Sequence, residues 1–311
     1  MNILIKDVYT PDALALLQTK EDVNLTRSYN LQLNEAELEE TDILLIRSRT
    51  KLSKEVLAKA KKIEFIVTAT SGYDHIDLEY CRQNQIKVAH TPDANRDSAA
   101  ELAIMLMLNC IRHSRDALTS IKANNWRQEV PRGHTLSGKA LGIIGLGRVG
   151  SRVAELAQGF KMKVTAFDPY QPDEQFQTYH VERSGYTELL KQSDIVSYHV
   201  PLTEETRYML NDRALASISK GTIVINTCRG GVVDEHALYR ALVSRKIAAA
   251  GLDVFEQEPL PKASDLRTLP NVFMTTHLGA YTYESISAAS RQAVQAVCLF
   301  LENKEVPCCL V

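Results

Sequence analysis

The 311-residue sequence has no run of about 18 apolar residues, the length that a membrane-spanning helix needs. It also has little net charge, because 36 basic side chains nearly balance 38 acidic ones and leave −2. General electrostatic binding to nucleic acid requires a large basic excess. We therefore expect neither a membrane nor a nucleic acid as a partner, and only a local basic pocket stays open.

The sequence also has no CxxC pair, and its cysteines lack the spacing of metal ligands. They are Cys81, Cys110, Cys228, Cys298, Cys308 and Cys309. Reduced thiols in a cytoplasmic protein that binds no metal are the simplest interpretation. The opening MNILIKDVY is charged at Lys6 and Asp7, so it predicts a first strand rather than the apolar core of a signal peptide.

Short β-rich runs alternate with helical segments along most of the chain, without low-complexity segments or short repeats. An early block contains NILI, DILLI, FIVTA and IKVAH, and a later block contains KVTAFD, DIVSYHV, TIVINT, AAAGLDV and NVFMTT. Such alternation predicts parallel sheets that helices cover on both faces. Two blocks in a chain of this length predict two doubly wound α/β domains.

Two long helices are predicted, one between the blocks and one at the end of the chain. The first covers DSAAELAIMLMLNCIRHSRDAL, with Asp97 or Ser98 as its N-cap, and the second runs over roughly 285–302. The first is apolar almost all round, which indicates burial within a domain, between domains or between subunits. We interpret both as crossings between the domains, which gives one domain of residues 1–98 and 286–311 and another of residues 99–285.

The segment LGIIGLGRVGSRVAELAQGFKMKVTAFD places three glycines, Gly145, Gly147 and Gly150, between an apolar strand and a helix. This G-x-G-x-x-G context predicts a dinucleotide-binding turn, in which the helix N-terminus holds the pyrophosphate. Asp168 ends the next strand, where a carboxylate accepts hydrogen bonds from ribose hydroxyls and repels a 2′-phosphate. The sequence therefore predicts NAD rather than NADP, and a plain glycine-rich turn would not require Asp168.

Three further polar groups follow consecutive predicted strands. Arg229 comes after TIVIN, an acidic residue comes after GLDV, and His277 comes after VFMTT. Because the carboxyl ends of parallel strands meet at one edge, we expect these groups to line one cleft. A carboxylate raises the pKa of a neighbouring histidine and fixes its tautomer, so the pair suits proton transfer during hydride transfer.

In order and spacing, the segments SGYDHIDL, AAELAIMLML, GKALGIIGLGRVG, HVPLTEETRYML, INTCRGGVVDEHALYRAL, GLDVFEQEP and HLGA resemble the D-isomer-specific 2-hydroxyacid dehydrogenase family. The resemblance implies a Rossmann NAD-binding domain, a flavodoxin-like substrate domain and a cleft between them. It also implies that Arg229, Glu258 and His277 are catalytic. Thr276, Cys228 and Tyr281 depart from the family pattern, and Tyr281 is expected to narrow or reshape the site.

The resemblance assigns Ser71 and Gly72 to the substrate carboxylate and Asp253 to the nicotinamide carboxamide, and it leaves Glu256 as a solvated residue. The full predicted cofactor set is Gly145, Gly147, Arg148, Val149, Gly150, Asp168, Val200, Pro201, Thr206, Thr227, Cys228, Arg229, Asp253, His277 and Gly279. The predicted substrate-binding set is Arg47, Arg49, Ser71, Gly72, Arg229 and His277. No metal is expected.

The segment RSRTKLS resembles the phosphoglycerate dehydrogenase branch, which oxidises D-3-phosphoglycerate in serine biosynthesis. There Arg47 and Arg49, alternating along a strand, would place one guanidinium in the cleft, and Arg127 or Arg132 would reach the substrate phosphate across a dimer. Two exposed arginines on a solvated face are the alternative. Since the chain ends at Val311, we expect no serine-binding regulatory domain.

Other functions stay open at this point. A glyoxylate/hydroxypyruvate reductase or another D-2-hydroxyacid dehydrogenase would share the same chemistry, and a non-enzymatic NAD-sensing interaction protein would not need the catalytic set. The family implies a homodimer or a dimer of dimers, with the apolar helix near 99–111 as a candidate dimer surface. The sequence does not fix the physiological direction of the reaction.

Overall fold

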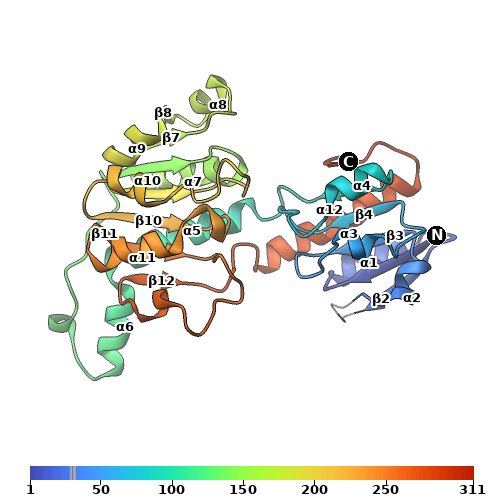
Figure 1. Cartoon of the computed structure of the whole chain (residues 1–311), viewed down its shortest axis with the longest axis horizontal. Helices are drawn as coiled ribbons and strands as arrows, with labels where there is room; N and C mark the ends of the chain where they lie inside the picture. Colours follow the sequence, from blue (N-terminus) through green and yellow to red (C-terminus); the bar gives the residue numbers. More distant parts are fainter. Residues whose placement is uncertain (29, 31–32) are drawn as a thin grey trace. The chain divides into compact units, whose positions relative to one another are not determined.

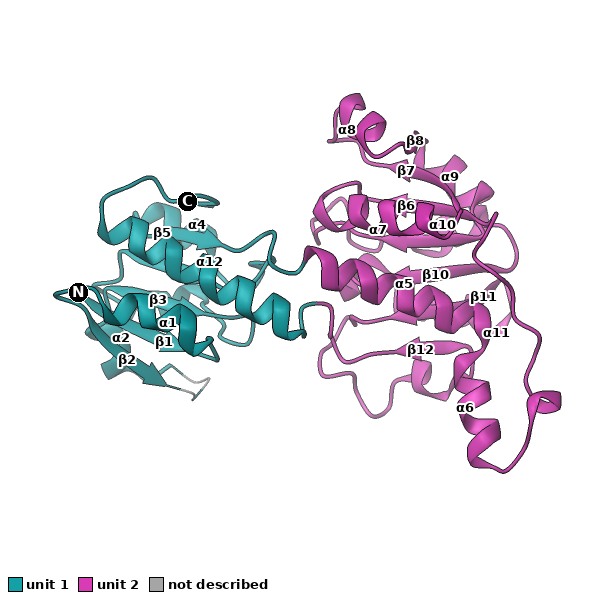
Figure 2. Ribbon diagram, turned by 180° about the vertical axis from the view of Figure 1, so that it is seen from behind, with its two compact units in different colours: residues 1–95, 280–311 teal, residues 96–279 magenta. Residues whose placement is uncertain are grey.

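The computed structural model describes every residue except 29, 31 and 32. The chain divides into two compact units, shown in Figure 2: unit 1 contains residues 1–95 and 280–311, and unit 2 contains residues 96–279. The boundaries differ by a few residues from those expected at 98/99 and 285/286. The reason is that each long helix belongs to one unit from its first turn.

The two long helices therefore do not act as crossings between the domains. Helix α5 (Arg96–Arg112) packs on the sheet of unit 2, and helix α12 (Tyr283–Leu301) packs on the sheet of unit 1 (Figure 1). The sequence predicted one helix through residue 118, but His113 adopts a left-handed conformation with φ of 51° and ends α5. Helix α6 (Ser114–Lys122) then projects from the sheet of unit 2.

Unit 1 contains a parallel five-stranded sheet in the order β2-β1-β3-β4-β5, which is the flavodoxin-like order. Its strands are β1 (Asn2–Lys6), β2 (Asn24–Ser28), β3 (Ile43–Ile46), β4 (Phe65–Thr68) and β5 (Lys87–His90). Its other helices are α1 (Pro11–Gln18), α2 (Glu35–Glu39), α3 (Lys54–Leu57) and α4 (Leu78–Gln83). The strand order reverses between β1 and β3, where such folds bind ligands.

The central strands of unit 1 are buried at every position, as expected for parallel strands covered on both faces. Successive side chains alternate between two apolar clusters. Leu45 and Phe65 join the cluster that contains Val297 of α12, whereas Leu44 and Ile66 join the cluster on the opposite face. The uninterrupted apolar runs of the sequence therefore reflect two buried faces.

Unit 2 contains a parallel seven-stranded sheet in the order β12-β11-β10-β9-β6-β7-β8. Its strands are β6 (Ala140–Ile144), β7 (Lys163–Phe167), β8 (Glu182–Arg183), β9 (Ile195–Tyr198), β10 (Thr222–Asn226), β11 (Ile247–Leu252) and β12 (Val272–Met274). Its other helices are α7 (Arg148–Gly159), α8 (Asp173–Thr178), α9 (Tyr186–Gln192), α10 (Asp212–Ser217) and α11 (Glu235–Val243). The short helices η1 (Arg127–Glu129), η2 (Gly230–Val232) and η3 (Asp265–Thr268) lie in its loops.

The predicted fold class is confirmed: both sheets are parallel, and helices cover them. Every β-rich run predicted from the sequence is a strand in the structure. The structure also contains two edge strands that were not predicted, β2 and β8. The strand order of unit 2 reverses between β9 and β6. In a doubly wound sheet, the crevice beyond the carboxyl ends of these two strands is the expected ligand site.

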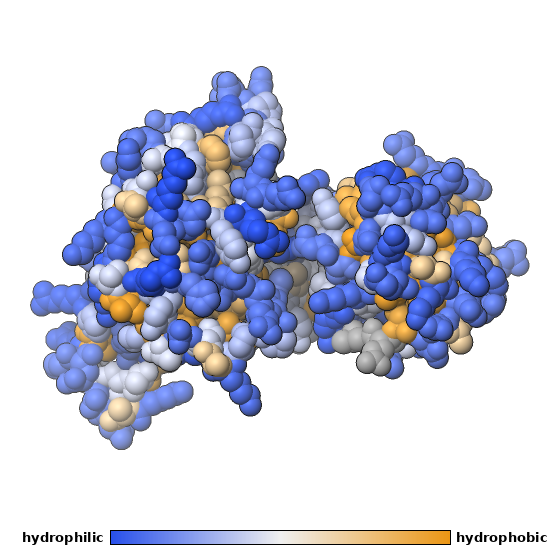
Figure 3. Space-filling model, viewed as in Figure 1, coloured by the Kyte–Doolittle hydropathy of each residue, from blue (hydrophilic) through white to orange (hydrophobic). Residues whose placement is uncertain are grey.

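No helix in the described part of the chain has the length and apolar character needed to cross a membrane. Among the same residues, no group of three or more His, Cys, Asp or Glu side chains is arranged to hold a metal ion. All six cysteines are free thiols. Hydrophilic residues cover most of the face shown in Figure 3, with smaller hydrophobic patches between them.

Candidate active site

The predicted functional residues of unit 2 follow the carboxyl ends of its strands. They are Gly145–Gly150 after β6, Asp168 after β7, Val200 and Pro201 after β9, Thr227–Arg229 after β10, Asp253 after β11 and His277 after β12. Because all these strands are parallel, their carboxyl ends lie along one edge of the sheet. That edge includes the point where the strand order reverses, so the fold brings the predicted residues together.

Each of the three positions after β6 requires or favours a glycine for a different structural reason. Gly145 has a φ of 93°, and a Cβ there would lie 2.5 Å from the carbonyl oxygen of His199. A Cβ on Gly150 would lie 1.9 Å from the carbonyl oxygen of Gly145, so helix α7 and the turn require a glycine to pack. Gly147 has open space within 4 Å of its Cβ position, which leaves its backbone accessible to a ligand.

The N-terminus of α7 suits a phosphate group. Gly147 is its N-cap and supplies no side-chain cap, and the first turn, with Arg148 and Val149, contains no acidic residue. The backbone N–H groups and the positive end of the helix dipole therefore favour an anion there. Together with the open side of Gly147, this geometry fits the pyrophosphate of NAD.

Asp168 ties the glycine turn to the loop after β7. Its Oδ2 accepts from Leu146 N at 2.8 Å, and its Oδ1 accepts from Tyr170 N at 2.9 Å and Gln171 N at 3.2 Å. A carboxylate has about four acceptor positions, so about one remains for a ribose hydroxyl. The predicted ribose contact is therefore compatible with a second, structural use of the same side chain.

The loops after β9 and β10 complete the cofactor edge. Thr206 Oγ1 donates to Pro201 O at 2.6 Å and so closes the turn that begins with Val200 and Pro201. Thr227 Oγ1 is buried and has no hydrogen-bond partner among the described residues. A buried hydroxyl without a protein partner fits a position beside a bound polar ligand.

Glu258 and His277 form an ion pair at the ends of β11 and β12. His277 Nδ1 donates to Glu258 Oε2 at 2.7 Å, and the other carboxylate oxygen, Oε1, accepts from Phe255 N at 3.0 Å. The His277 side chain is 48% exposed and the Glu258 side chain 36% exposed. The pair is thus fixed on the protein side and accessible from outside.

The electrostatics of this pair favour its charged form. The hydrogen bond to Glu258 is the main cause that raises the pKa of His277; burial opposes it, and the charge of Glu258 supports it. Burial is the largest influence on the pKa of Glu258 and would raise it. The hydrogen bond and charge of His277, with smaller contributions from Phe255 N–H and Arg229, nevertheless hold the pKa of Glu258 below its usual value.

Arg229 lies in the neighbouring loop and is held by local contacts. Its Nη1 donates to the Cys228 carbonyl at 2.7 Å, and its own carbonyl accepts from Asn226 Nδ2 at 2.9 Å. Asn226 also accepts from Cys228 N at 3.1 Å. Asn226 was not among the residues predicted from the sequence. The signal that could have marked it is an Asn at a strand end, since Asn side chains often bond the backbone of the following turn.

Asp253, to which the resemblance assigned the nicotinamide carboxamide, is engaged within the protein. It is completely buried, and its carboxylate accepts from Thr275 Oγ1 at 2.6 Å, Leu278 N at 2.7 Å and Gly279 N at 2.9 Å. Its own carbonyl accepts from His277 N at 2.9 Å. Asp253 therefore fixes the loop that carries His277 and Gly279.

Glu256 is exposed, as the sequence predicted, but its carboxylate also has two protein partners. Its Oε1 accepts from Glu235 N at 2.9 Å, and its Oε2 accepts from Tyr208 Oη at 3.0 Å. These partners lie 21 and 48 positions away in the sequence. No local pattern marks such contacts, because they depend on the packing of two strand-end loops.

The predicted substrate residues of unit 1 lie at the ends of the adjacent strands β3 and β4. Arg47 and Arg49 do not alternate along a strand as predicted, because β3 ends at Ile46 and the chain then turns. Arg47 Nη2 donates to Ile286 O at 3.5 Å. Arg49 is 63% exposed at its side chain and pairs with Asp7 at 2.9 Å.

The Ser71–Gly72 segment after β4 is held through its carbonyl groups. His90 Nδ1 donates to Ser71 O at 2.9 Å, and Thr70 Oγ1 donates to Gly72 O at 2.7 Å. The backbone N–H groups of Ser71 and Gly72 find no acceptor among the described residues. Two adjacent N–H groups of this kind suit a carboxylate. Arg127 and Arg132 are exposed in unit 2, beyond α6.

Comparison with known proteins agrees with this geometry. A family model described as "D-isomer specific 2-hydroxyacid dehydrogenase, NAD binding domain" matches residues 104–279. A hydroxypyruvate reductase of Thermotoga maritima is 39% identical over 297 residues, which cover 94% of this chain and 96% of the relative. A D-3-phosphoglycerate dehydrogenase of Methanocaldococcus jannaschii is 40% identical over 290 residues, which cover 93% of this chain but only 55% of the relative.

A solved structure is similar over almost the whole chain. It is the D-lactate dehydrogenase of Aquifex aeolicus in complex with NAD and lactic acid, at 31% identity and a TM-score of 0.88, covering 97% of this chain and 96% of that one. The predicted family and the predicted cofactor, NAD, are thereby confirmed. The chain belongs to the D-isomer-specific 2-hydroxyacid dehydrogenases, and unit 2 contains the NAD-binding domain of that family.

Proposed function

We propose that the chain oxidises D-3-phosphoglycerate to 3-phosphohydroxypyruvate with NAD. The observation that carries this proposal is the pair Arg47 and Arg49 at the end of β3, next to the Ser71–Gly72 segment at the end of β4. A guanidinium group binds phosphate through charge-assisted hydrogen bonds. A substrate held at its carboxylate by Ser71 and Gly72 would present its phosphate to the arginines.

The catalytic roles in this proposal follow the geometry of unit 2. Arg229 binds the substrate carboxylate and polarises the C2 oxygen. His277 accepts the proton of the C2 hydroxyl on its Nε2, because its Nδ1 is engaged by Glu258. Glu258 stabilises the imidazolium that results. In the reverse direction the imidazolium returns this proton to the carbonyl oxygen.

When bound, NAD accepts the hydride of substrate C2 at its nicotinamide ring. The proposed contacts of the protein with the cofactor are the glycine turn for the pyrophosphate, Asp168 for the ribose hydroxyls, and Thr227 for the nicotinamide side. The buried Thr227 hydroxyl without a protein partner supports the last of these. The buried Asp253 carboxylate is proposed to act indirectly, through the loop of Leu278 and Gly279.

A second candidate is a glyoxylate/hydroxypyruvate reductase. The Thermotoga maritima relative bears the name hydroxypyruvate reductase, and the match covers 96% of its length. The match to the D-3-phosphoglycerate dehydrogenase of Methanocaldococcus jannaschii covers only 55% of that protein. The ion pair of Arg49 with Asp7 also reduces the positive charge that a phosphate would meet. This second function requires the same Arg229, Glu258 and His277.

A substrate panel with the purified protein distinguishes the two candidates. It measures NAD reduction with D-3-phosphoglycerate and NADH oxidation with phosphohydroxypyruvate, hydroxypyruvate, glyoxylate and pyruvate. Turnover of glyoxylate or hydroxypyruvate without activity on either phosphorylated substrate contradicts the first proposal and supports the second. Lack of activity on every compound would contradict both.

Arg49→Ala sharpens this test. If Arg49 binds phosphate, KM for the phosphorylated substrate should rise about tenfold or more, since a hydrogen bond to a charged group contributes ~1.5–3 kcal/mol. KM for hydroxypyruvate should stay unchanged. The matched control is Arg82→Ala, which removes an exposed arginine of α4 that forms an ion pair with Glu79 in the same helix.

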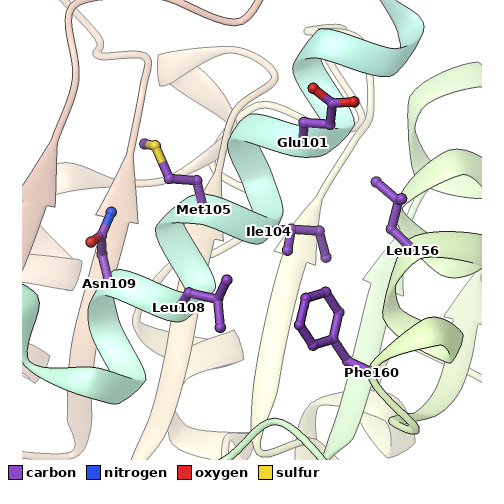
Figure 4. A pocket seen from close by; sticks show the side chains of 7 residues that line it. All are labelled: Glu101, Ile104, Met105, Leu108, Asn109, Leu156 and Phe160. Atoms are coloured by element: carbon purple, nitrogen blue, oxygen red, sulfur yellow. The ribbon is translucent and has the colours of Figure 1, made fainter.

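We also propose that the protein is a homodimer or a dimer of dimers, with α5 and α6 in its interface. An open hollow of about 420 Å³ lies between α5 and the end of α7 (Figure 4). Its apolar lining comes from Ile104, Met105, Leu108, Leu156 and Phe160. On α6 and the segment after it, Leu118, Ile121 and Trp126 are exposed. Burial of these apolar side chains would favour association with a second copy of the chain.

A further inference from the structure

Glu235 and Glu256 form a reciprocal contact between two strand-end loops of unit 2. Glu256 Oε1 accepts from Glu235 N at 2.9 Å, and Glu235 Oε1 accepts from Glu256 N at 2.6 Å. Each carboxylate thus binds the backbone N–H of the other residue. We name this arrangement of Glu235 and Glu256 the glutamate clasp.

The two loops that the clasp joins carry the proposed catalytic residues. Glu235 begins α11, six positions after Arg229, and Glu256 lies two positions before Glu258. The loops are in direct contact, because a Cβ on Gly230 would lie only 2.0 Å from Phe255 O and 2.4 Å from Glu256 N. The clasp therefore fixes a contact that small backbone shifts would otherwise open.

Tyr208 links the same two loops by a second route. Its Oη donates to Glu256 Oε2 at 3.0 Å, and its backbone N donates to Gly231 O at 2.8 Å. Both carboxylate oxygens of Glu256 are consequently engaged, one by the start of α11 and one by Tyr208. Glu256 is exposed, yet its side chain makes two hydrogen bonds across loops, and its backbone N–H donates a third to Glu235.

The backbone that the clasp holds also orients Glu258. Glu258 Oε1 accepts from Phe255 N at 3.0 Å, directly before Glu256 in the chain, while Oε2 accepts from His277. If the backbone at 255 and 256 moves, the carboxylate of Glu258 loses the donor that sets its orientation. Its geometry with His277 then becomes less well defined.

We infer that Glu256 is a positioning residue of the reaction, because the glutamate clasp holds the loop of Glu258 against the loop of Arg229. The inference rests on the proposed catalytic roles of Glu258 and His277. Glu256 itself lies outside the reacting groups and acts through Glu258. The clasp would thereby set the strength of the Glu258–His277 hydrogen bond, and with it the proton affinity of His277.

A purely structural role of Glu256 makes a different prediction. Its carboxylate binds the first N–H of α11, where an acidic side chain also interacts favourably with the helix dipole. Loss of that contact alone would lower thermal stability and leave the titration of His277 unchanged. The titration of His277 therefore distinguishes positioning from mere stabilisation.

The experiment compares Glu256→Ala, Glu256→Gln and Gln257→Ala with the wild type. Gln257 is the matched control, since it is an exposed neighbour with no side-chain hydrogen bond in the described structure. NMR follows the titration of the His277 imidazole in each protein, and steady-state assays give kcat and KM for NADH and the 2-oxo acid between pH 6 and 9. Thermal unfolding reports stability separately.

For Glu256→Ala we expect the measured pKa of His277 to fall toward its ordinary value and kcat of reduction to fall about twofold on the alkaline side, which is less than the loss expected when the Glu258 charge itself is removed. KM for NADH should change less than about twofold, because the glycine turn is untouched. Glu256→Gln keeps an oxygen for Glu235 N and should recover most of the rate. Gln257→Ala should match the wild type.

A Glu256→Ala protein that is less stable but retains the wild-type pKa of His277 overturns the inference. If Glu256→Ala does not fold, Glu235→Ala carries the same test, because it removes the other carboxylate of the clasp, which accepts from Glu256 N. Failure of the proposed function gives a different result: the wild type would then lack activity while the NMR titrations still respond to Glu256. The two failures are therefore distinguishable.

Discussion

Replacing Glu258 with Gln should shift the pH dependence of the reaction without abolishing it. The wild-type carboxylate lies 2.7 Å from His277 Nδ1, and this contact is the main reason that the pKa of His277 is raised. Gln is nearly isosteric but uncharged, so the pKa of His277 should fall in the variant. Burial and the charge of Arg229, which both lower the pKa of His277, would then be less opposed.

The magnitude follows from the exposure of the pair. The side chains are 48% and 36% exposed, so water screens their interaction and it contributes about 0.5–1 kcal/mol. This corresponds to about a two- to fivefold change in the ratio of protonated to neutral His277. Because reduction needs the imidazolium, the reductive rate of Glu258→Gln should fall by about that factor on the alkaline side. Near pH 6 the difference should be smaller.

The oxidative direction gives the opposite sign, because it needs neutral His277. There the acidic limb of Glu258→Gln should move to lower pH, so its relative rate should rise below neutrality. The assay is kcat/KM against pH in both directions, with Gln257→Ala as the control. Coincident limbs in the variant and the wild type would refute the electrostatic role of Glu258.

The same pair predicts how stability depends on pH. Since the folded pKa of His277 is raised, its contribution is complete below the unfolded value of about 6.5 and is lost as the pH rises through the folded pKa. Since the folded pKa of Glu258 is lowered, its contribution is present above about 4.3 and is lost as the pH falls through the folded pKa. Thermal unfolding should therefore show the greatest loss for Glu258→Gln between these two limits.

Further substitutions test the other parts of the site. Arg229→Ala should lower kcat/KM about 10²-fold or more and raise KM for the 2-oxo acid. The reason is that a hydrogen bond to the substrate carboxylate, which contributes ~1.5–3 kcal/mol, and the polarisation of the carbonyl are both lost. Wild-type kcat and KM in this variant would exclude a role of Arg229 in binding the substrate carboxylate. Asp168→Ala should weaken the preference for NAD over NADP, and an unchanged ratio of the two kcat/KM values would count against the ribose contact. In Gly147→Ala there is room for the added Cβ, so the protein should fold normally but bind NADH weakly in a fluorescence titration. In Gly150→Ala the added Cβ would lie 1.9 Å from Gly145 O, so the melting temperature should fall. Trp126→Asp should weaken self-association, measured by light scattering after gel filtration, if α6 and its following segment lie in the dimer interface.

The sequence was sufficient to predict the central strands and the fold class. Runs such as DILLI and TIVIN are apolar without alternation because their strands are buried on both faces. It was insufficient at the edges, where β2 is mostly polar and β8 has only two residues. It also missed the break at His113, because the apolar pattern continues beyond a residue whose backbone leaves the helical region.

The candidate site was predictable to the extent that its residues follow strands. Arg229, Glu258 and His277 could be grouped because parallel strands end at one edge, and the structure places Glu258 and His277 in hydrogen-bond contact. The environment of each residue was not predictable in the same way. The sequence suggests no ion-pair partner for Arg49, because the residue with which it pairs, Asp7, lies 42 positions earlier and follows a different strand.

The three acids of DVFEQEP show why sequence position alone does not assign a role. Asp253 and Glu256 lie three positions apart, yet the first is completely buried among three donors of the loop that carries His277, and the second joins a loop that starts after β10. Each therefore fixes a different side of the Glu258–His277 pair. If both supports are needed, the effects of Asp253→Asn and Glu256→Ala on the pKa of His277 should not be additive, since either loss already frees one partner of the hydrogen bond.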